Sequence, residues 1–91
     1  MEINLEREFE IKNMLGLHAR AAAQLVRLTN GYVSDIKLVR ENMEVNGKSI
    51  MGVLMLAAPK GARIKVLATG GDADAALSAI GELIDHKFGE E

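Results

Sequence analysis

The sequence predicts an α+β fold in which helices cover one face of a mainly antiparallel β-sheet. Four short segments alternate apolar and polar residues with the period of a half-buried strand, and three segments repeat apolar residues at helical spacing. Glycine, asparagine and proline turn signals separate these segments. In chain order the pattern is βαββαβα, and helices packed on one side of a sheet bury both kinds of apolar face.

The first three predicted elements extend to residue 40. Residues 3–11 alternate apolar and polar side chains except at Arg7, which falls on the apolar side, and this pattern predicts a first strand. A helix is predicted over about residues 19–29 and is closed by Asn30-Gly31, because both residue types tolerate the left-handed conformation that ends many helices. The second strand is predicted over residues 32–40, with Ile36 and Leu38 as core contacts.

A third strand and a short helix follow. The strand is predicted around residues 43–45, and Asn46-Gly47 is a strong turn signal. Ser49 is a good N-cap residue for a helix predicted from Ile50 to about Ala58.

The last two predicted elements complete the pattern. Residues 63–68 alternate as a fourth strand, and Gly70-Gly71 breaks it. Asp72 is predicted to cap a final helix whose apolar residues recur at helical spacing as far as Phe88, with Gly89 as the natural stop.

Composition narrows the classes of function. A chain of 91 residues, 48% hydrophobic, predicts one small domain over residues 1–91 with a modest core. Such a core leaves little room for a deep enclosed pocket, so we expect the chemistry on an exposed surface and the substrate to be another protein. A formal net charge of −2 argues against nucleic-acid binding.

The chain also lacks several compartment and membrane signals. It has no cysteine, which excludes a disulfide framework and a zinc–thiolate site. No signal-peptide pattern opens the sequence, and no apolar run approaches the ~20 residues that a membrane span needs. We therefore expect a cytoplasmic protein without membrane insertion.

A glycine, a histidine and an arginine stand together at the start of the first predicted helix. Gly16 gives a tight turn, His18 lies at the helix threshold, and Arg20 follows two residues later. The first N–H groups of a helix have no intrahelical partner and carry the positive end of its dipole, which suits phosphate. A nitrogen nucleophile beside a fixed positive charge indicates transient phosphorylation of His18.

The same residues carry a family resemblance. Gly16-Leu17-His18-Ala19-Arg20 resembles the active-site signature of the HPr family, the phosphocarriers of the bacterial phosphoenolpyruvate–sugar phosphotransferase system (PTS). The resemblance continues at residues 46–53, which are similar to the regulatory-serine segment of the family, and through residues 56–61. It covers essentially the whole chain. One departure is Ala21, where the family usually has proline.

The resemblance implies a fold and a mechanism. The fold is an open-faced β-sandwich with sheet order 1-4-2-3. His18 accepts a phosphoryl group on Nδ1 from phosphorylated enzyme I and passes it to EIIA-type proteins, while Arg20 stabilises the group. We expect no metal and no cofactor, and a stoichiometric relay rather than an enzyme. The expected phosphate-cradling turn comprises Gly16, Leu17, Ala19 and Ala21.

Ser49 has two open interpretations. A serine at this place is explained as a helix N-cap, and the resemblance implies regulatory phosphorylation by a serine kinase and its phosphorylase. A phosphate would add up to two negative charges at a helix start, where they are tolerated, so its effect would fall on partner docking.

The short helix from residue 50 is apolar nearly all the way round, so part of it must stay exposed or be covered by a partner. The resemblance implies a docking face on this helix and the first helix for enzyme I and EIIA, formed by Ala19, Arg20, Gln24, Arg27, Ile50, Met51 and Leu54.

Other classes remain as alternatives. A regulatory HPr-like paralogue, of the nitrogen-related branch or signalling through Ser49, fits the same fold. A small hydrolase similar to acylphosphatase needs an arginine-lined phosphate loop, which residues 3–18 lack.

For the oligomeric state we expect a monomer, which fits a relay that presents one face to successive partners.

Overall fold

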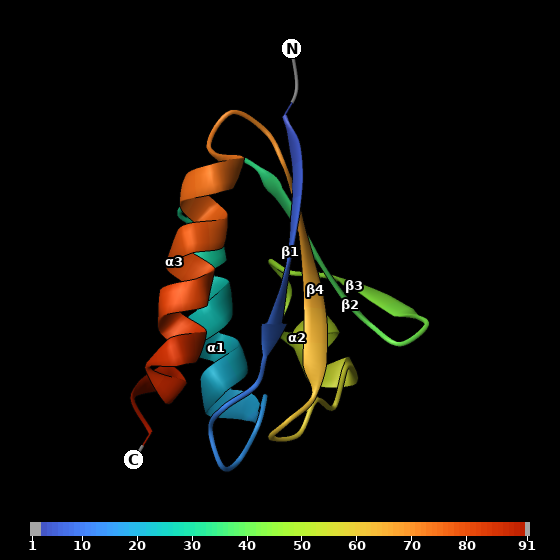
Figure 1. Cartoon of the computed structure of the whole chain (residues 1–91), viewed down its shortest axis with the longest axis vertical. Coiled ribbons are helices and arrows are strands. Elements are labelled where there is room, and N and C mark those ends of the chain that lie inside the picture. Colours follow the sequence, from blue (N-terminus) through green and yellow to red (C-terminus); the bar gives the residue numbers. More distant parts are fainter. Residues whose placement is uncertain (1–2, 91) are drawn as a thin grey trace.

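The computed structural model describes residues 3–90 and confirms the predicted element order (Figure 1). A 3₁₀ turn, η1, follows the last helix. The strands are β1 (Asn4–Glu10), β2 (Asp35–Arg40), β3 (Met43–Asn46) and β4 (Arg63–Thr69), and the helical elements are α1 (Ala19–Thr29), α2 (Ile50–Met55), α3 (Ala73–Asp85) and η1 (Lys87–Gly89).

The strands form one antiparallel sheet in the order β1-β4-β2-β3, which confirms the order implied by the family resemblance. Side chains alternate between its two faces: Ile64 and Val66 of β4 are buried, whereas Arg63 and Lys65 are exposed. The exposed face carries cross-strand ion pairs such as Lys65 with Glu6, at 3.5 Å. The apolar face is the one that the helices cover.

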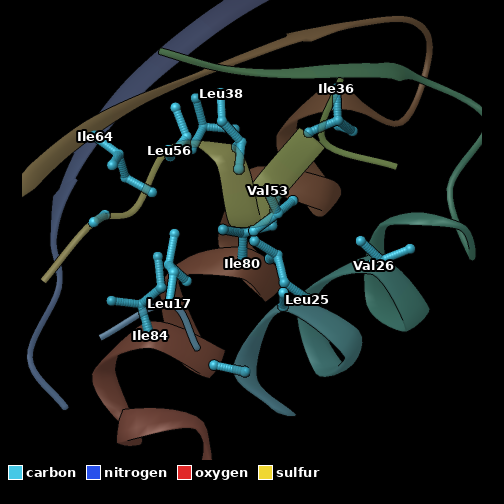
Figure 2. Close-up of a cluster of buried hydrophobic side chains, with 14 of the residues drawn as sticks. Leu17, Leu25, Val26, Ile36, Leu38, Val53, Leu56, Ile64, Ile80 and Ile84 are labelled. Carbon is cyan, nitrogen blue, oxygen red and sulfur yellow. The ribbon is translucent and has the colours of Figure 1, made fainter. Parts of the chain in front are cut away.

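The core lies between that face and the helices. Figure 2 shows side chains of the sheet, of α1, of α2 and of α3 converging on one another. Burying an aliphatic side chain of this size contributes about 1.5–3 kcal/mol each, so these contacts hold the helices on the sheet. The labelled side chains are Leu17, Leu25, Val26, Ile36, Leu38, Val53, Leu56, Ile64, Ile80 and Ile84.

The second strand begins later than its sequence pattern predicts. The prediction was residue 32, but β2 starts at Asp35. The Asp72 carboxylate accepts hydrogen bonds from the Val33 N–H at 2.9 Å, the Ser34 N–H at 3.0 Å and the Ser34 hydroxyl. These contacts hold residues 33–34 outside the strand. Asp72 occupies the N-cap position of α3, yet its side chain bonds to this loop and not to the helix.

Three helix ends also differ from expectation. Asn30 closes α1 in a right-handed conformation, φ −68°, so the predicted left-handed ending is wrong. Helix α2 ends at Met55, three residues before the predicted Ala58, and Ala57 adopts φ +48°. Phe88 lies outside α3, in η1, where it is buried at 4% exposure. Burial of the Phe88 ring therefore holds the chain in place beyond the end of α3. The apolar spacing predicted that Phe88 is buried but not that the helix ends before it.

Within residues 3–90, no helix combines the length and the apolar character that crossing a bilayer requires.

Acid unfolding should report on the Asp72 contacts. The Ser34 hydroxyl, followed by the Val33 N–H, lowers the pKa of the Asp72 carboxyl from its ordinary value of 3.8. A depressed carboxyl pKa stabilises the fold above pH 3.8, and this stability is lost as the pH falls through the folded-state value. We therefore expect Asp72→Asn to lower Tm at neutral pH and to show a shallower loss of Tm on acidification.

Asp74→Asn is the matched control, because Asp74 is an exposed carboxylate in the same helical turn, paired with Arg7 at 3.3 Å. Thermal melts across the acid range measure the effect. If Asp72→Asn and the wild type lost Tm in parallel, the Asp72 carboxylate would not stabilise the fold as proposed.

Candidate functional site

The loop between β1 and α1 brings His18 to the molecular surface. Gly16 adopts φ +67°, and a Cβ atom at this position would overlap the Ala58 carbonyl oxygen. Leu17 donates its N–H to the same carbonyl at 2.9 Å, and its side chain is buried in the core. Only glycine adopts the left-handed conformation here without strain or overlap. The chain therefore emerges from the core at a fixed point directly before His18.

His18 is the N-cap residue of α1. Its ring Nδ1 accepts a hydrogen bond from the Arg20 N–H at 3.3 Å, and its Nε2 lies 3.0 Å from Oε2 of Glu90. The His18 carbonyl accepts the first intrahelical bond, from the Ala22 N–H at 2.8 Å. The side chain is 29% exposed. Nδ1 is therefore directed at the start of the helix and remains close to solvent.

The start of α1 is suited to an anion. The N–H groups of Ala19 and Ala21 precede that of Ala22, which is the first to donate within the helix, and so they have no partner inside the helix. No acidic residue stands in the first turn of α1. Arg20 is exposed, and its guanidinium forms no ion pair with any other group of residues 3–90. The helix dipole and a free guanidinium thus favour negative charge beside Nδ1.

Two of the four residues predicted to cradle the phosphate, Gly16 and Leu17, have N–H groups that are already hydrogen-bonded. The Gly16 N–H bonds to the Asn13 carbonyl at 3.2 Å, and the Leu17 N–H is taken by Ala58. These two residues shape the turn, whereas the amides of Ala19, Arg20 and Ala21 face the open end of the helix. The Ala21 side chain is fully buried.

Glu90 and Asn13 also contribute to this site, and no sequence signal predicted either of them. The Glu90 carboxylate accepts hydrogen bonds from Asn13 Nδ2 at 3.0 Å and from the Leu15 N–H at 3.1 Å, besides its contact with His18. These bonds, that of Asn13 foremost, lower the pKa of Glu90 from its ordinary value of 4.5, so the carboxylate is ionised at neutral pH. Glu90 lies 72 residues from His18, and no local motif connects them.

A small hollow of about 90 Å³ opens beside His18, between the start of α1 and the C-terminal segment. Figure 1 shows these two parts at the same end of the molecule. Pockets for small-molecule substrates usually measure about 300–1,000 Å³, so this hollow is too small to enclose such a substrate. Its lining residues are Leu15, His18, Arg20, Gln24, Phe88, Gly89 and Glu90.

A larger hollow of about 430 Å³ lies on the open face of the sheet, over β2 and β3, and shares no lining residue with the first. Its charged side chains include Lys37 and Glu44, which pair with each other at 3.5 Å. Among residues 3–90, no group of three or more His, Cys, Asp or Glu side chains could hold a metal ion.

Helix α2 and its N-cap carry the predicted regulatory serine and part of the predicted docking face. Ser49 Oγ accepts the Gly52 N–H at 3.1 Å, so the serine is a genuine N-cap. Met51 is 75% exposed, although it is apolar. Helix α2 packs against α1, where Arg27 is exposed and Gln24 is half-buried. The exposed large apolar side chains of α2 are Ile50, Met51, Leu54 and Met55.

The chain is similar to known phosphocarrier proteins. The family model described as "PTS HPr component phosphorylation site" matches residues 5–86. The chain is 45% identical over 87 residues to the phosphocarrier protein HPr of Xylella fastidiosa, covering 96% of this chain and 98% of that protein. It is also 45% identical over 86 residues to the phosphocarrier protein NPr of Shewanella violacea, covering 94% of each.

Solved structures show the same likeness. The crystal structure of HPr-C-His from Thermoanaerobacter tengcongensis superposes with a TM-score of 0.92 at 44% identity, over 96% of this chain and 98% of that one. A crystal structure described as an HPr dimer from the same organism gives a TM-score of 0.77 at 44% identity, over 90% of this chain and 94% of that one.

Substitution of Gly16 should test the turn before the histidine. We expect Gly16→Ala to lower the free energy of unfolding by about 1–3 kcal/mol, because the new Cβ meets the Ala58 carbonyl in a strained left-handed conformation. Denaturant titration measures the change. Gly71→Ala is the control, since a Cβ there enters open space. Equal stability of the two variants would show that the close approach at Gly16 is unimportant.

Proposed function

Because this chain belongs to the HPr family of PTS phosphocarrier proteins, we propose that His18 is the residue that receives and passes on the phosphoryl group. The observation that supports the proposal is the place of His18 at the N-cap of α1, with Nδ1 3.3 Å from the Arg20 amide nitrogen. A nucleophilic nitrogen there faces the positive end of the helix.

The proposed reaction has two steps. In the first, the Nδ1 lone pair attacks the phosphorus of phosphorylated enzyme I, a new N–P bond forms, and the bond between phosphorus and the donor breaks. In the second, a nucleophile of an EIIA-type protein attacks the same phosphorus, and the N–P bond at His18 breaks. Neither step requires a cofactor from this chain.

The start of α1 and the Arg20 side chain have complementary roles in this scheme. The amides of Ala19 and Ala21 offer hydrogen bonds to phosphoryl oxygens, and the dipole of α1 favours their charge. The guanidinium of Arg20 can bind two oxygens at once, as its planar fork does with phosphate generally. The group on His18 is thereby stabilised while its phosphorus stays open to an acceptor.

The proposed docking surface is the exposed apolar side of α2 together with the adjoining side of α1. Exposed apolar patches on small domains commonly mark protein interfaces, and methionine adapts to several partners. The surface would bind enzyme I and EIIA in turn, and we expect a monomer to suffice. Its proposed residues are Ala19, Arg20, Gln24, Arg27, Ile50, Met51 and Leu54.

Ser49 is proposed as a regulatory phosphorylation site at the edge of this surface. A phosphate on Ser49 would lie next to exposed Ile50 and place negative charge beside an apolar interface, which weakens docking. The likeness to a protein named NPr keeps a regulatory branch of the PTS open as the setting.

Phosphorylation by enzyme I tests the proposal directly. We expect incubation with phosphoenolpyruvate, Mg²⁺ and enzyme I to add one acid-labile, base-stable phosphoryl group, measured by intact mass. His18→Ala should abolish it, whereas His86→Ala, which removes the other histidine, should not. Arg20→Gln should slow transfer roughly 10²-fold, as loss of one charge-stabilising group does. Arg63→Gln, an equal charge change on the open sheet face, is its control.

An adduct that survives in His18→Ala, or equal rates for Arg20→Gln and Arg63→Gln, would refute the assigned roles. Absence of any adduct with the cognate enzyme I would shift the function to Ser49 and a regulatory module.

The residue after Arg20 offers a separate test. Ala21→Pro should retain phosphorylation and transfer, because the Ala21 N–H has no intrahelical partner to lose and proline is tolerated in a first helical turn. Initial transfer rates for both proteins measure the effect. Loss of transfer in the proline variant would contradict this expectation and show that the Ala21 N–H is essential for transfer.

A further inference from the structure

Glu90 contacts the His18 ring on the side opposite the helix, and the transfer scheme above does not use it. We propose that Glu90 is a positioning residue that holds neutral His18 in the tautomer with its proton on Nε2, which leaves the lone pair on Nδ1. The catalytic consequence rests on the proposed function, but the tautomer itself does not.

The hydrogen-bond partners of the ring define its protonation. The Arg20 N–H can only donate, so Nδ1, which lies 3.3 Å from it, must carry a lone pair. An ionised carboxylate can only accept, so Nε2, 3.0 Å from Glu90 Oε2, must carry the proton. A doubly protonated ring would set Nδ1–H against the Arg20 N–H. Both contacts therefore select the same neutral tautomer.

Three donors converge on the Glu90 side chain, namely Asn13 Nδ2, the Leu15 N–H and His18 Nε2–H. Only a carboxylate can accept from all three, because both of its oxygens are acceptors. A glutamine amide at this position would have a single accepting oxygen, and its NH₂ group would face at least one of the donors. Hydrogen bonds from Asn13 and Leu15 lower the pKa of Glu90 and so keep it ionised. No other carboxylate of residues 3–90 contacts the ring.

The surrounding structure fixes the carboxylate. Phe88 is buried, and the turn beyond it is closed by bonds from the Gly89 N–H to the His86 carbonyl and from the Glu90 N–H to the Lys87 carbonyl, both 2.9 Å. Asn13 is fully buried and is itself oriented by a 2.8 Å bond to the Gly16 carbonyl. Glu90 is thus held by the core and by the same turn that presents His18.

This arrangement has a consequence for transfer. When Nδ1 bonds to phosphorus, the ring becomes positively charged and keeps its Nε2 proton, and the carboxylate 3.0 Å away stabilises that charge. When the phosphoryl group leaves, the electron pair returns to Nδ1 and the ring regains its neutral tautomer. No proton has to leave or enter the ring in either direction.

Nitrogen-15 NMR of the His18 ring, at a pH where the ring is neutral, tests the proposal without any phosphorylation. The wild type should show the Nε2–H tautomer almost alone. In Glu90→Gln the Nδ1–H fraction should rise several-fold, because the amide NH₂ can face Nε2 and favour a lone pair there. Asp85→Asn is the control, since it removes a neighbouring carboxylate that pairs with Lys12 at 2.7 Å.

Phosphorylation rates complete the experiment. Glu90→Gln should be phosphorylated about 10–10²-fold more slowly than Asp85→Asn, which is the usual effect of losing a partner that orients a functional histidine. Unchanged tautomer populations in Glu90→Gln would overturn the proposal, even if the rate fell. A tautomer shift in a protein that enzyme I does not phosphorylate would support the positioning role and refute the proposed function.

Discussion

The close approach of Gly16 to the backbone of Ala58 determines where His18 lies. Because the residue has no Cβ, the loop can press against the segment after α2, and the Leu17 side chain can enter the core. The chain then turns directly into α1 with His18 at its N-cap. The His18 ring is therefore attached to the core through two successive residues, which gives a site at the surface a fixed geometry.

Opposite charges are arranged on the two sides of the His18 ring. The start of α1 and Arg20 present positive potential to Nδ1, and the Glu90 carboxylate presents negative charge to Nε2. A phosphoryl group on Nδ1 would place its negative oxygens at the helix start and the ring's positive charge beside Glu90. Each half of the bonded pair would thus meet a complementary partner, and the phosphoryl group would lie at the small hollow beside His18.

Sequence patterns predicted the fold well where local periodicity decides it. Alternation along residues 63–68 and helical spacing around Leu77 and Ile80 reflect one buried face each, and they fixed the order of elements. Element ends were less predictable, because distant contacts set them: Asp72 holds Ser34, 38 residues away, outside β2. The same limit applies to the site. Its glycine, histidine and arginine are contiguous, whereas Glu90 reaches His18 only through the buried Phe88 and the turn after α3.

We expect Nδ1 of His18, and not Nε2, to be the nucleophile, because the helix start faces Nδ1 and the Glu90 carboxylate faces Nε2. The most direct measurement is ³¹P–¹⁵N coupling in the phosphorylated, ¹⁵N-histidine-labelled protein, which identifies the nitrogen bonded to phosphorus. The expected result is coupling to Nδ1 of His18, beside the Arg20 amide, with Nε2 still protonated and facing Glu90. Coupling to Nε2 would contradict it, because phosphorus would then occupy the place where the Glu90 carboxylate lies.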